Sequence, residues 1–176
     1  VVEATLYIKP LPKYRAMGTA HFDKLEDAGN TISSIISHGI TPSMLELMDH
    51  VAIIALNNAL DMGLPDVAAI VIFEADGMIK ESVDYEINAI KEICKENNGT
   101  GIEVSDDPDE MARIYSGRKN LFPSLSRYGE GLASTSLADD MAVPISKIAH
   151  TVQKIHEIAD RNNLVMSAYG HCGSGL

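Results

Sequence analysis

The spacing of apolar residues predicts strands that alternate with helices along the chain. The strongest strand signal is the nearly continuous apolar run at residues 67–73, which is typical of a strand in the middle of a sheet. The other predicted strands cover residues 2–8, 14–22, 43–48, 101–104 and 164–168. Two prolines within residues 9–12 cannot continue a strand ladder, so this stretch is predicted to be a stiff connector.

Apolar residues at helical spacing fill most of the intervals between these strands. The predicted helices cover residues 23–38, 49–60, 79–97, 107–117 and 145–158. Asp23 and Glu26 form a capping-box pattern at the start of the first of these helices. The helix that begins after Asp107 carries Pro108 in its first turn, and it is predicted to end near Gly117.

The order of elements from residue 14 to residue 104 defines the expected fold. It reads strand, helix, strand, extra helix, strand, helix and strand, which is the β-α-β-β-α-β pattern of a ferredoxin-like sandwich. We expect an α+β fold with an antiparallel sheet, helices on one face of it, and extra C-terminal helices. Residues 14–104 would be the ferredoxin-like core. Residues 105–176 would add helices, a long loop at 118–137 and a final strand that leads to active-site residues.

Composition and charge narrow the classes of function. The net charge of the 176 residues is −11 and Lys and Arg do not cluster, which argues against a nucleic-acid-binding surface. No apolar run approaches the length of a transmembrane helix, and no secretory leader opens the chain. The two cysteines follow no disulfide pattern, which favours a reducing compartment. We expect a cytoplasmic protein, which could also lie peripherally at the inner membrane face.

The C-terminal sequence contains the first candidate for chemistry. His171 lies between Gly170 and Gly173 after an apolar run, so metal, flavin or substrate could approach its imidazole closely. The alternative is an ordinary surface histidine near a chain end. Because the chain stops soon after this residue and opens inside a strand-like pattern, we expect a piece of a larger enzyme. The other histidines show no metal-ligand spacing and are interpreted as structural.

Two adjacent cations, Arg118 and Lys119, are the second candidate. They stand at the expected junction of helix and long loop in an otherwise acidic chain. A guanidinium can hold a substrate carboxylate through two parallel hydrogen bonds, whereas the alternative role is a favourable contact with a helix C-terminus. The carboxylates of Asp139 and Asp140 could bind a metal or act as acid and base, or could simply lie near a helix N-terminus.

Several motifs, taken in order, resemble one family. They are FDKLEDAGN (22–30), MLELMD (44–49), GRKNLFP (117–123), DMAVPISK (140–147) and GHCG (170–173). Their order and spacing resemble the C-terminal part of the FAD-linked oxidases of the vanillyl-alcohol oxidase type. Within it, they are most similar to the glycolate oxidase FAD subunit and to the D-lactate dehydrogenases that pass electrons to cytochrome or quinone. The resemblance covers nearly the whole chain.

This resemblance implies a cap domain, residues 1–176, that covers the flavin and shapes the substrate site. FAD would be bound mainly by an N-terminal domain that is absent from this chain. The full enzyme would oxidise a 2-hydroxy acid of the glycolate or D-lactate type, with a hydride passing to flavin N5 and a proton to a base. The isolated chain would bind no FAD and be inactive.

The resemblance also assigns roles to single residues. Arg118 matches an arginine expected to pair with the substrate carboxylate. Lys119, singled out above as the adjacent cation and not by the resemblance, is expected to bind substrate beside it. His171 matches the first histidine of a Gly-His-x-Gly-Asp-Gly-Asn-x-His pattern, which implies a catalytic role. In metal-dependent members this histidine also helps hold a divalent ion that polarises the 2-hydroxyl. Ser174 and Leu176 stand where that pattern has Asp and Asn, which weakens the expectation of a metal.

The partners expected from this reading are the substrate, the FAD-binding domain of the same polypeptide and an electron-acceptor subunit. A homo-oligomer is expected as well, because an apolar surface left uncovered promotes association. The alternative hypothesis is a stand-alone ferredoxin-like module for ligand binding or oligomerisation without catalysis. The sandwich pattern supports both hypotheses, because a fold does not fix a function.

Overall fold

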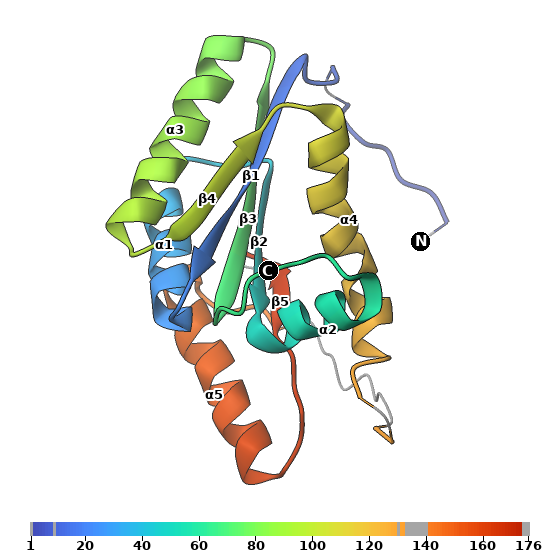
Figure 1. Cartoon of the computed structure of the whole chain (residues 1–176). Coiled ribbons are helices and arrows are strands. Elements are labelled where there is room, and N and C mark those ends of the chain that lie inside the picture. The colour runs from blue at the N-terminus through green and yellow to red at the C-terminus, as the bar shows by residue number, and fades with distance from the viewer. Residues whose placement is uncertain (1, 9, 130, 133–140, 174–176) are drawn as a thin grey trace.

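A five-stranded antiparallel sheet forms the centre of the molecule, with strand order β4-β1-β3-β2-β5. The computed structural model in Figure 1 describes residues 2–8, 10–129, 131–132 and 141–173. The strands are β1 (Tyr14–Phe22), β2 (Met44–Asp49), β3 (Ala69–Gly77), β4 (Thr100–Ser105) and β5 (Tyr169–His171). The helices are α1 (Leu25–Ser37), α2 (His50–Leu60), α3 (Lys80–Glu96), α4 (Pro108–Leu125) and α5 (Ile148–Arg161), with a short 3-10 turn η1 (Ile145–Lys147).

The first four strands confirm the expected α+β ferredoxin-like fold. Their order β4-β1-β3-β2, with every neighbouring pair antiparallel, is the arrangement that the β-α-β-β-α-β pattern predicts. The strongly apolar strand β3 lies in the middle of the sheet as expected, and residues 69–75 of it are all buried. The short strand β5 extends the sheet beyond β2.

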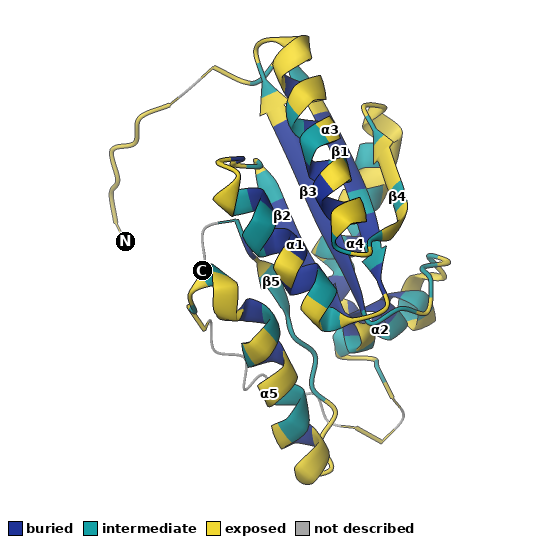
Figure 2. Cartoon of the chain, turned by 90° about the vertical axis from the view of Figure 1, so that its left-hand side faces the viewer, coloured by how far each residue is buried: buried dark blue, intermediate teal, exposed yellow. Residues whose placement is uncertain are grey.

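The two helices of the ferredoxin-like pattern, α1 and α3, pack on one face of this sheet as predicted, and additional helices also cover the other face. Helices α1, α3 and α5 pack on one face, and α2 and α4 lie on the other (Figure 1). Strand alternation divides β2 between the two cores: Leu45 and Leu47 face α1 and α3, whereas Met48 faces α2 and α4. In Figure 2 strands β1 and β3 are mostly dark blue behind α1 and α3, because helices bury both faces there, whereas the edge strand β4 is largely exposed.

Helix α4 is longer than predicted, and it replaces the first part of the expected 118–137 loop. It continues through Gly117 and Pro123 to Leu125. Gly117 is buried, and a Cβ there would lie 3.2 Å from the Met62 side chain, so a glycine allows this close contact. Leu121, on the inner face of α4, is fully buried against α2 and the sheet. This packing outweighs the helix-breaking tendency of Gly117 and Pro123. Residues 130 and 133–137 lie outside the described part of the chain.

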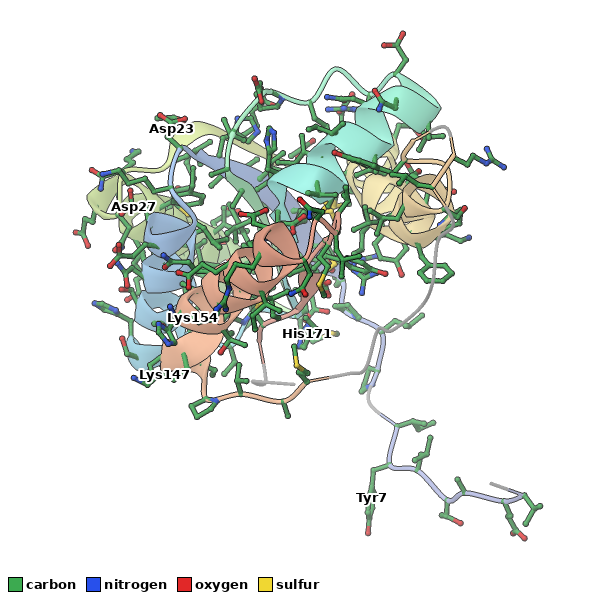
Figure 3. All side chains as sticks on the ribbon, turned by 90° about the horizontal axis from the view of Figure 1, so that it is seen from below. Tyr7, Asp23, Asp27, Lys147, Lys154 and His171 are labelled. Carbon is green, nitrogen blue, oxygen red and sulfur yellow. The ribbon has the colours of Figure 1, made fainter. Side chains whose placement is uncertain are left out.

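Two predictions for the N-terminal third are wrong. Residues 2–8 are not a strand, and they pair with none of the described strands. They extend away from the folded body, and Tyr7 on this segment is fully exposed (Figures 2 and 3). The capping box is not formed either. Helix α1 begins at Leu25 with Lys24 at the cap position, which leaves Asp23 one residue too early to cap it.

The last strand begins later than predicted. Leu164 and Val165 are exposed and unpaired, and pairing with β2 starts only at Tyr169. The reason is tertiary: the Asp49 carboxylate accepts hydrogen bonds from Ser167 and Ala168, and these hold the chain just before β5. His171 therefore lies within the sheet ladder, not in a loop that follows it.

Candidate functional site

Strand pairing brings His171 to a buried carboxylate, that of Glu46. The two residues lie directly opposite each other in the β2–β5 pair. Glu46 shares its side-chain orientation with Met44 and Met48, so it points to the face covered by α4. The segment that carries His171 is therefore placed by the sheet, and His171 lies near the centre of the molecule seen from below in Figure 3.

The Glu46 carboxylate bridges the two residues that the sequence analysis singled out. Arg118 Nε donates a hydrogen bond of 2.5 Å to Glu46 Oε2, and His171 Nδ1 lies 3.3 Å from Glu46 Oε1. Glu46 is only 6% exposed, whereas the side chains of Arg118 and His171 are 33% and 40% exposed. A buried carboxylate is thus joined to two cationic or potentially cationic groups that both reach solvent.

Tyr169 completes this cluster on the same side of the sheet. It pairs with Met48, two residues before His171 pairs with Glu46, so both side chains project towards α4. The Arg118 guanidinium lies over the Tyr169 ring, 5.7 Å from its centroid. A cation above an aromatic face is attracted by the ring quadrupole, so Tyr169 and Glu46 together restrict where the guanidinium can lie.

A second buried carboxylate lies at the end of the same strand but has a different environment. Asp49 caps α2 by accepting a hydrogen bond from Ala52 N, and it also binds Ser167 Oγ and Ala168 N. On its other side, His156 Nε2 of α5 lies 3.0 Å from Asp49 Oδ2. This hydrogen bond raises the pKa of His156, although partial burial acts in the opposite direction. Asp49 is therefore fully engaged in holding elements together.

The structure separates the predicted site residues into two groups. Arg118 and His171 meet at Glu46, as described above. Lys119 is exposed and forms no ion pair with any other described residue, so nothing in the described geometry joins it to the cluster. Asp139 and Asp140 lie outside the described residues.

The described residues do not provide the ligands that the expected divalent ion needs. Among them, no three or more His, Cys, Asp or Glu side chains are close enough together to hold a metal. His171 has one such neighbour, Glu46, whereas a catalytic ion commonly takes about three protein ligands. The expectation that His171 binds a metal is not supported by the described residues. Ser174 and Leu176 lie outside the described residues.

FAD does not fit the hollows of the described structure. One open hollow of about 520 Å³ is lined by the carboxylates of Asp23, Asp49, Asp66 and Asp160 and by the imidazoles of His50 and His156. The carboxylates outnumber the imidazoles, which disfavours a pyrophosphate. A second, of about 270 Å³, lies between the sheet, α2 and α4. It is smaller than the roughly 300–1,000 Å³ usual for small-molecule sites.

Comparison with known proteins decides the family. The family model described as FAD linked oxidases, C-terminal domain, matches residues 11–176. The chain belongs to this family. It is 28% identical to the glycolate oxidase subunit GlcD of Bacillus subtilis, over 99% of this chain and 36% of that protein. It is also 28% identical to GlcD of Escherichia coli K12, over 98% of this chain and 34% of that protein.

Relatives of this FAD-linked oxidase domain at lower sequence identity include D-lactate dehydrogenases. The mitochondrial D-lactate dehydrogenase [cytochrome] of Arabidopsis thaliana is 23% identical over 99% of this chain and 30% of that protein. Among solved structures, alkyldihydroxyacetonephosphate synthase matches 92% of this chain and 34% of that chain, with a TM-score of 0.61 and 12% identity. That likeness concerns the fold alone. The domain spans about a third of the length of these relatives.

Sequence reasoning missed Glu46 in this FAD-linked oxidase domain, although the motif MLELMD contained it. The available signal was a charged residue between apolar neighbours in a strand that the structure buries. A buried charge needs a partner, so such a residue marks a position where an ion pair is expected. Tyr169 was also missed, because nothing local indicates that an arginine lies over its ring. No described helix combines the length and apolar character needed to cross a membrane.

Proposed function

We propose that this chain is the substrate-binding cap domain of an FAD-dependent oxidoreductase that oxidises a 2-hydroxy acid of the glycolate or D-lactate type. Family membership supports FAD-linked oxidation, and the names of the relatives support the substrate class. The observation that carries the proposal is the meeting of Arg118 and His171 at Glu46. FAD is assigned to a separate domain of the same polypeptide.

In this proposal Arg118 binds the substrate carboxylate. Its hydrogen bond to Glu46 uses the Nε–H, and the guanidinium carries further N–H groups on its two terminal nitrogens. These groups can receive a carboxylate in the paired geometry that arginine favours. The side chain is held on one side by Glu46 and reaches solvent on the other, as a ligand-binding group must. Lys119 would contribute positive charge from the helix surface.

His171 takes the proton of the substrate 2-hydroxyl in the same proposal. Its Nδ1 faces Glu46, which leaves Nε2 as the nitrogen that can accept a proton. A glycine at position 173 keeps the space beside this nitrogen open, because a Cβ there would lie 3.0 Å from Nε2.

Three further expectations remain predictions. They are the electron-acceptor subunit, the homo-oligomer, and the cytoplasmic location, which includes the inner membrane face.

The test uses the full-length gene product. Its flavin content is recorded, and D-lactate, glycolate and D-2-hydroxyglutarate are screened with a dye acceptor. We expect bound flavin and turnover of at least one of these acids. In that protein, Arg118→Ala should lower kcat/KM by roughly 100-fold, mainly through KM, because a charge-assisted bidentate contact is lost.

Two results would contradict this proposal. A full-length protein without flavin and without oxidation of any 2-hydroxy acid would favour the alternative of a non-catalytic ligand-binding or oligomerisation module. An active protein in which Arg118→Ala leaves both KM and kcat/KM unchanged would remove Arg118 from its role. Lys119→Ala serves as the neighbouring charge control and should have a much smaller effect, since Lys119 is exposed.

A further inference from the structure

We propose that Glu46 is a positioning residue that sets both the location of the Arg118 guanidinium and the tautomer of His171. This inference rests on the proposed function of those two residues. Glu46 itself does not touch the substrate, because it is buried in the sheet beneath them. One carboxylate thereby prepares a group that binds an anion and a group that accepts a proton.

Glu46 orders the side chain of Arg118. The side chain comes from α4, and its only partner among the charged described residues is Glu46 on the sheet, at 2.5 Å. An arginine side chain has many rotamers, and ordering it costs conformational entropy. The bond to Glu46 and the ring of Tyr169 order it before substrate arrives, so substrate binding does not have to supply that order.

Glu46 also determines which nitrogen of His171 carries the hydrogen. An ionised carboxylate only accepts hydrogen bonds, so the His171 Nδ1 that faces Glu46 must carry the hydrogen. In a neutral imidazole this leaves the lone pair on Nε2, which is the arrangement a proton acceptor needs. A glutamine at position 46 could donate its amide N–H to Nδ1 instead. That would favour the tautomer with hydrogen on Nε2, which cannot accept the substrate proton.

Glu74 provides a matched control within the same sheet face. Like Glu46 it is 6% exposed, and it is bound to one arginine, Arg15, at 2.8 Å. It lies on β3 opposite Met44, and no described histidine contacts it. The two glutamates are therefore alike in burial and in pairing with arginine, and they differ in that only Glu46 also meets a histidine.

The experiment compares Glu46→Gln and Glu74→Gln in the full-length flavoprotein. Glu46→Gln should raise KM for the best acid found by roughly tenfold and lower kcat by roughly tenfold, since both substrate-facing groups are disturbed. Glu74→Gln should change neither constant. In an Arg118→Ala background, Glu46→Gln should no longer raise KM but should still lower kcat, because the KM effect acts through Arg118 and the kcat effect through His171.

A second measurement does not depend on activity. The rate at which phenylglyoxal modifies each arginine is followed by peptide mass spectrometry. Glu46→Gln should speed modification of Arg118 severalfold and leave Arg15 unchanged, whereas Glu74→Gln should do the reverse. If Glu46→Gln fails to fold, every arginine reacts faster, and Glu46→Asp, which is too short to reach both partners, is then measured with the same expected outcomes.

The outcomes separate this inference from the proposed function. If Arg118→Ala has no kinetic effect, the proposed function fails, but the labelling experiment still tests whether Glu46 holds Arg118. If Arg118→Ala raises KM while Glu46→Gln or Glu46→Asp behaves as wild type in KM, kcat and Arg118 labelling, Glu46 is not a positioning residue. A KM effect of Glu46→Gln that persists unchanged without Arg118 would also overturn the inference.

Discussion

Strand β2 carries two buried carboxylates that lie three positions apart and face opposite sides of the sheet. Asp49 is 2% exposed and Glu46 is 6% exposed. Each carboxylate is contacted by one histidine, Asp49 by His156 and Glu46 by His171. Asp49 is bound by two backbone N–H groups, a serine and a histidine. Among the described residues, the Glu46 carboxylate is bound only by two side chains, both of which reach solvent.

This difference teaches how to tell a structural carboxylate from a site carboxylate. Backbone donors cannot move without unfolding the elements they belong to, so Asp49 fixes the start of α2 and the approach to β5. Side-chain donors with exposed ends can keep one bond to Glu46 and offer their remaining groups to a ligand. We therefore expect mutations of Asp49 to act mainly on stability and mutations of Glu46 mainly on activity.

The largest expected loss of stability follows Asp49→Ala. The variant removes a helix cap, worth about 1 kcal/mol, and leaves buried donors without an acceptor, so the free energy of unfolding should fall by about 3 kcal/mol. Glu46→Gln keeps a polar group of similar size and should cost about 1 kcal/mol. Urea denaturation of the same chain measures both. Asp66→Ala, at an exposed aspartate, should stay within about 0.5 kcal/mol of wild type. Equal losses for Asp49→Ala and Glu46→Gln would remove the distinction.

A smaller effect is expected from the pH dependence of the Asp49 contact. The pKa of His156 is raised in the folded state, mainly by its hydrogen bond to Asp49, so protonated His156 stabilises the fold. This stabilisation is complete below the unfolded-state pKa of about 6.5 and is lost as the pH rises through the higher folded-state pKa. Unfolding measured across this range should show the loss in wild type and a flatter profile in His156→Gln. The exposed His150, replaced by Gln, is the control, and an identical flattening there would contradict the assignment.

The smallest expected effect concerns space beside the imidazole. In Gly173→Ala a Cβ would lie 3.0 Å from His171 Nε2, so the ring or the loop must shift by a few tenths of an ångström. In the full-length enzyme kcat/KM should fall by roughly threefold, because a small displacement of a reacting group lowers the rate. Gly170→Ala is the matched control, since nothing lies within 4 Å of a Cβ there. If both alanines have the same effect, crowding of His171 is not the cause.

Local sequence signals predicted most elements of the fold but failed where packing opposed them. Strand β1 was predicted with its observed bounds, because alternation is a local property. Gly117 and Pro123 favoured the end of a helix, yet α4 continues to Leu125. It does so because Gly117 fits closely against Met62 and because Leu121 on the inner face of α4 is buried in the core. Residues 2–8 alternate like a strand, but alternation does not provide a neighbouring strand to pair with.

The candidate site was predicted only in part. Arg118 and His171 could be singled out because a cation in an acidic chain and a histidine among glycines are visible in the sequence. Their roles remain predictions. The Glu46 carboxylate that joins them could not be assigned, because its partners lie 72 and 125 positions away along the chain.

The sequence by itself determined the α+β class and the order of the ferredoxin-like elements, and it singled out Arg118 and His171 as candidates, because periodicity and residue type are visible over a few neighbouring positions. Only the tertiary structure decided that helices cover both faces of the sheet, where β5 begins, and that a guanidinium and an imidazole share one buried carboxylate. Those features depend on strand register and on helix packing between segments that are distant in the sequence. The need to pair a buried charge also depends on burial, which a short stretch of sequence does not reveal.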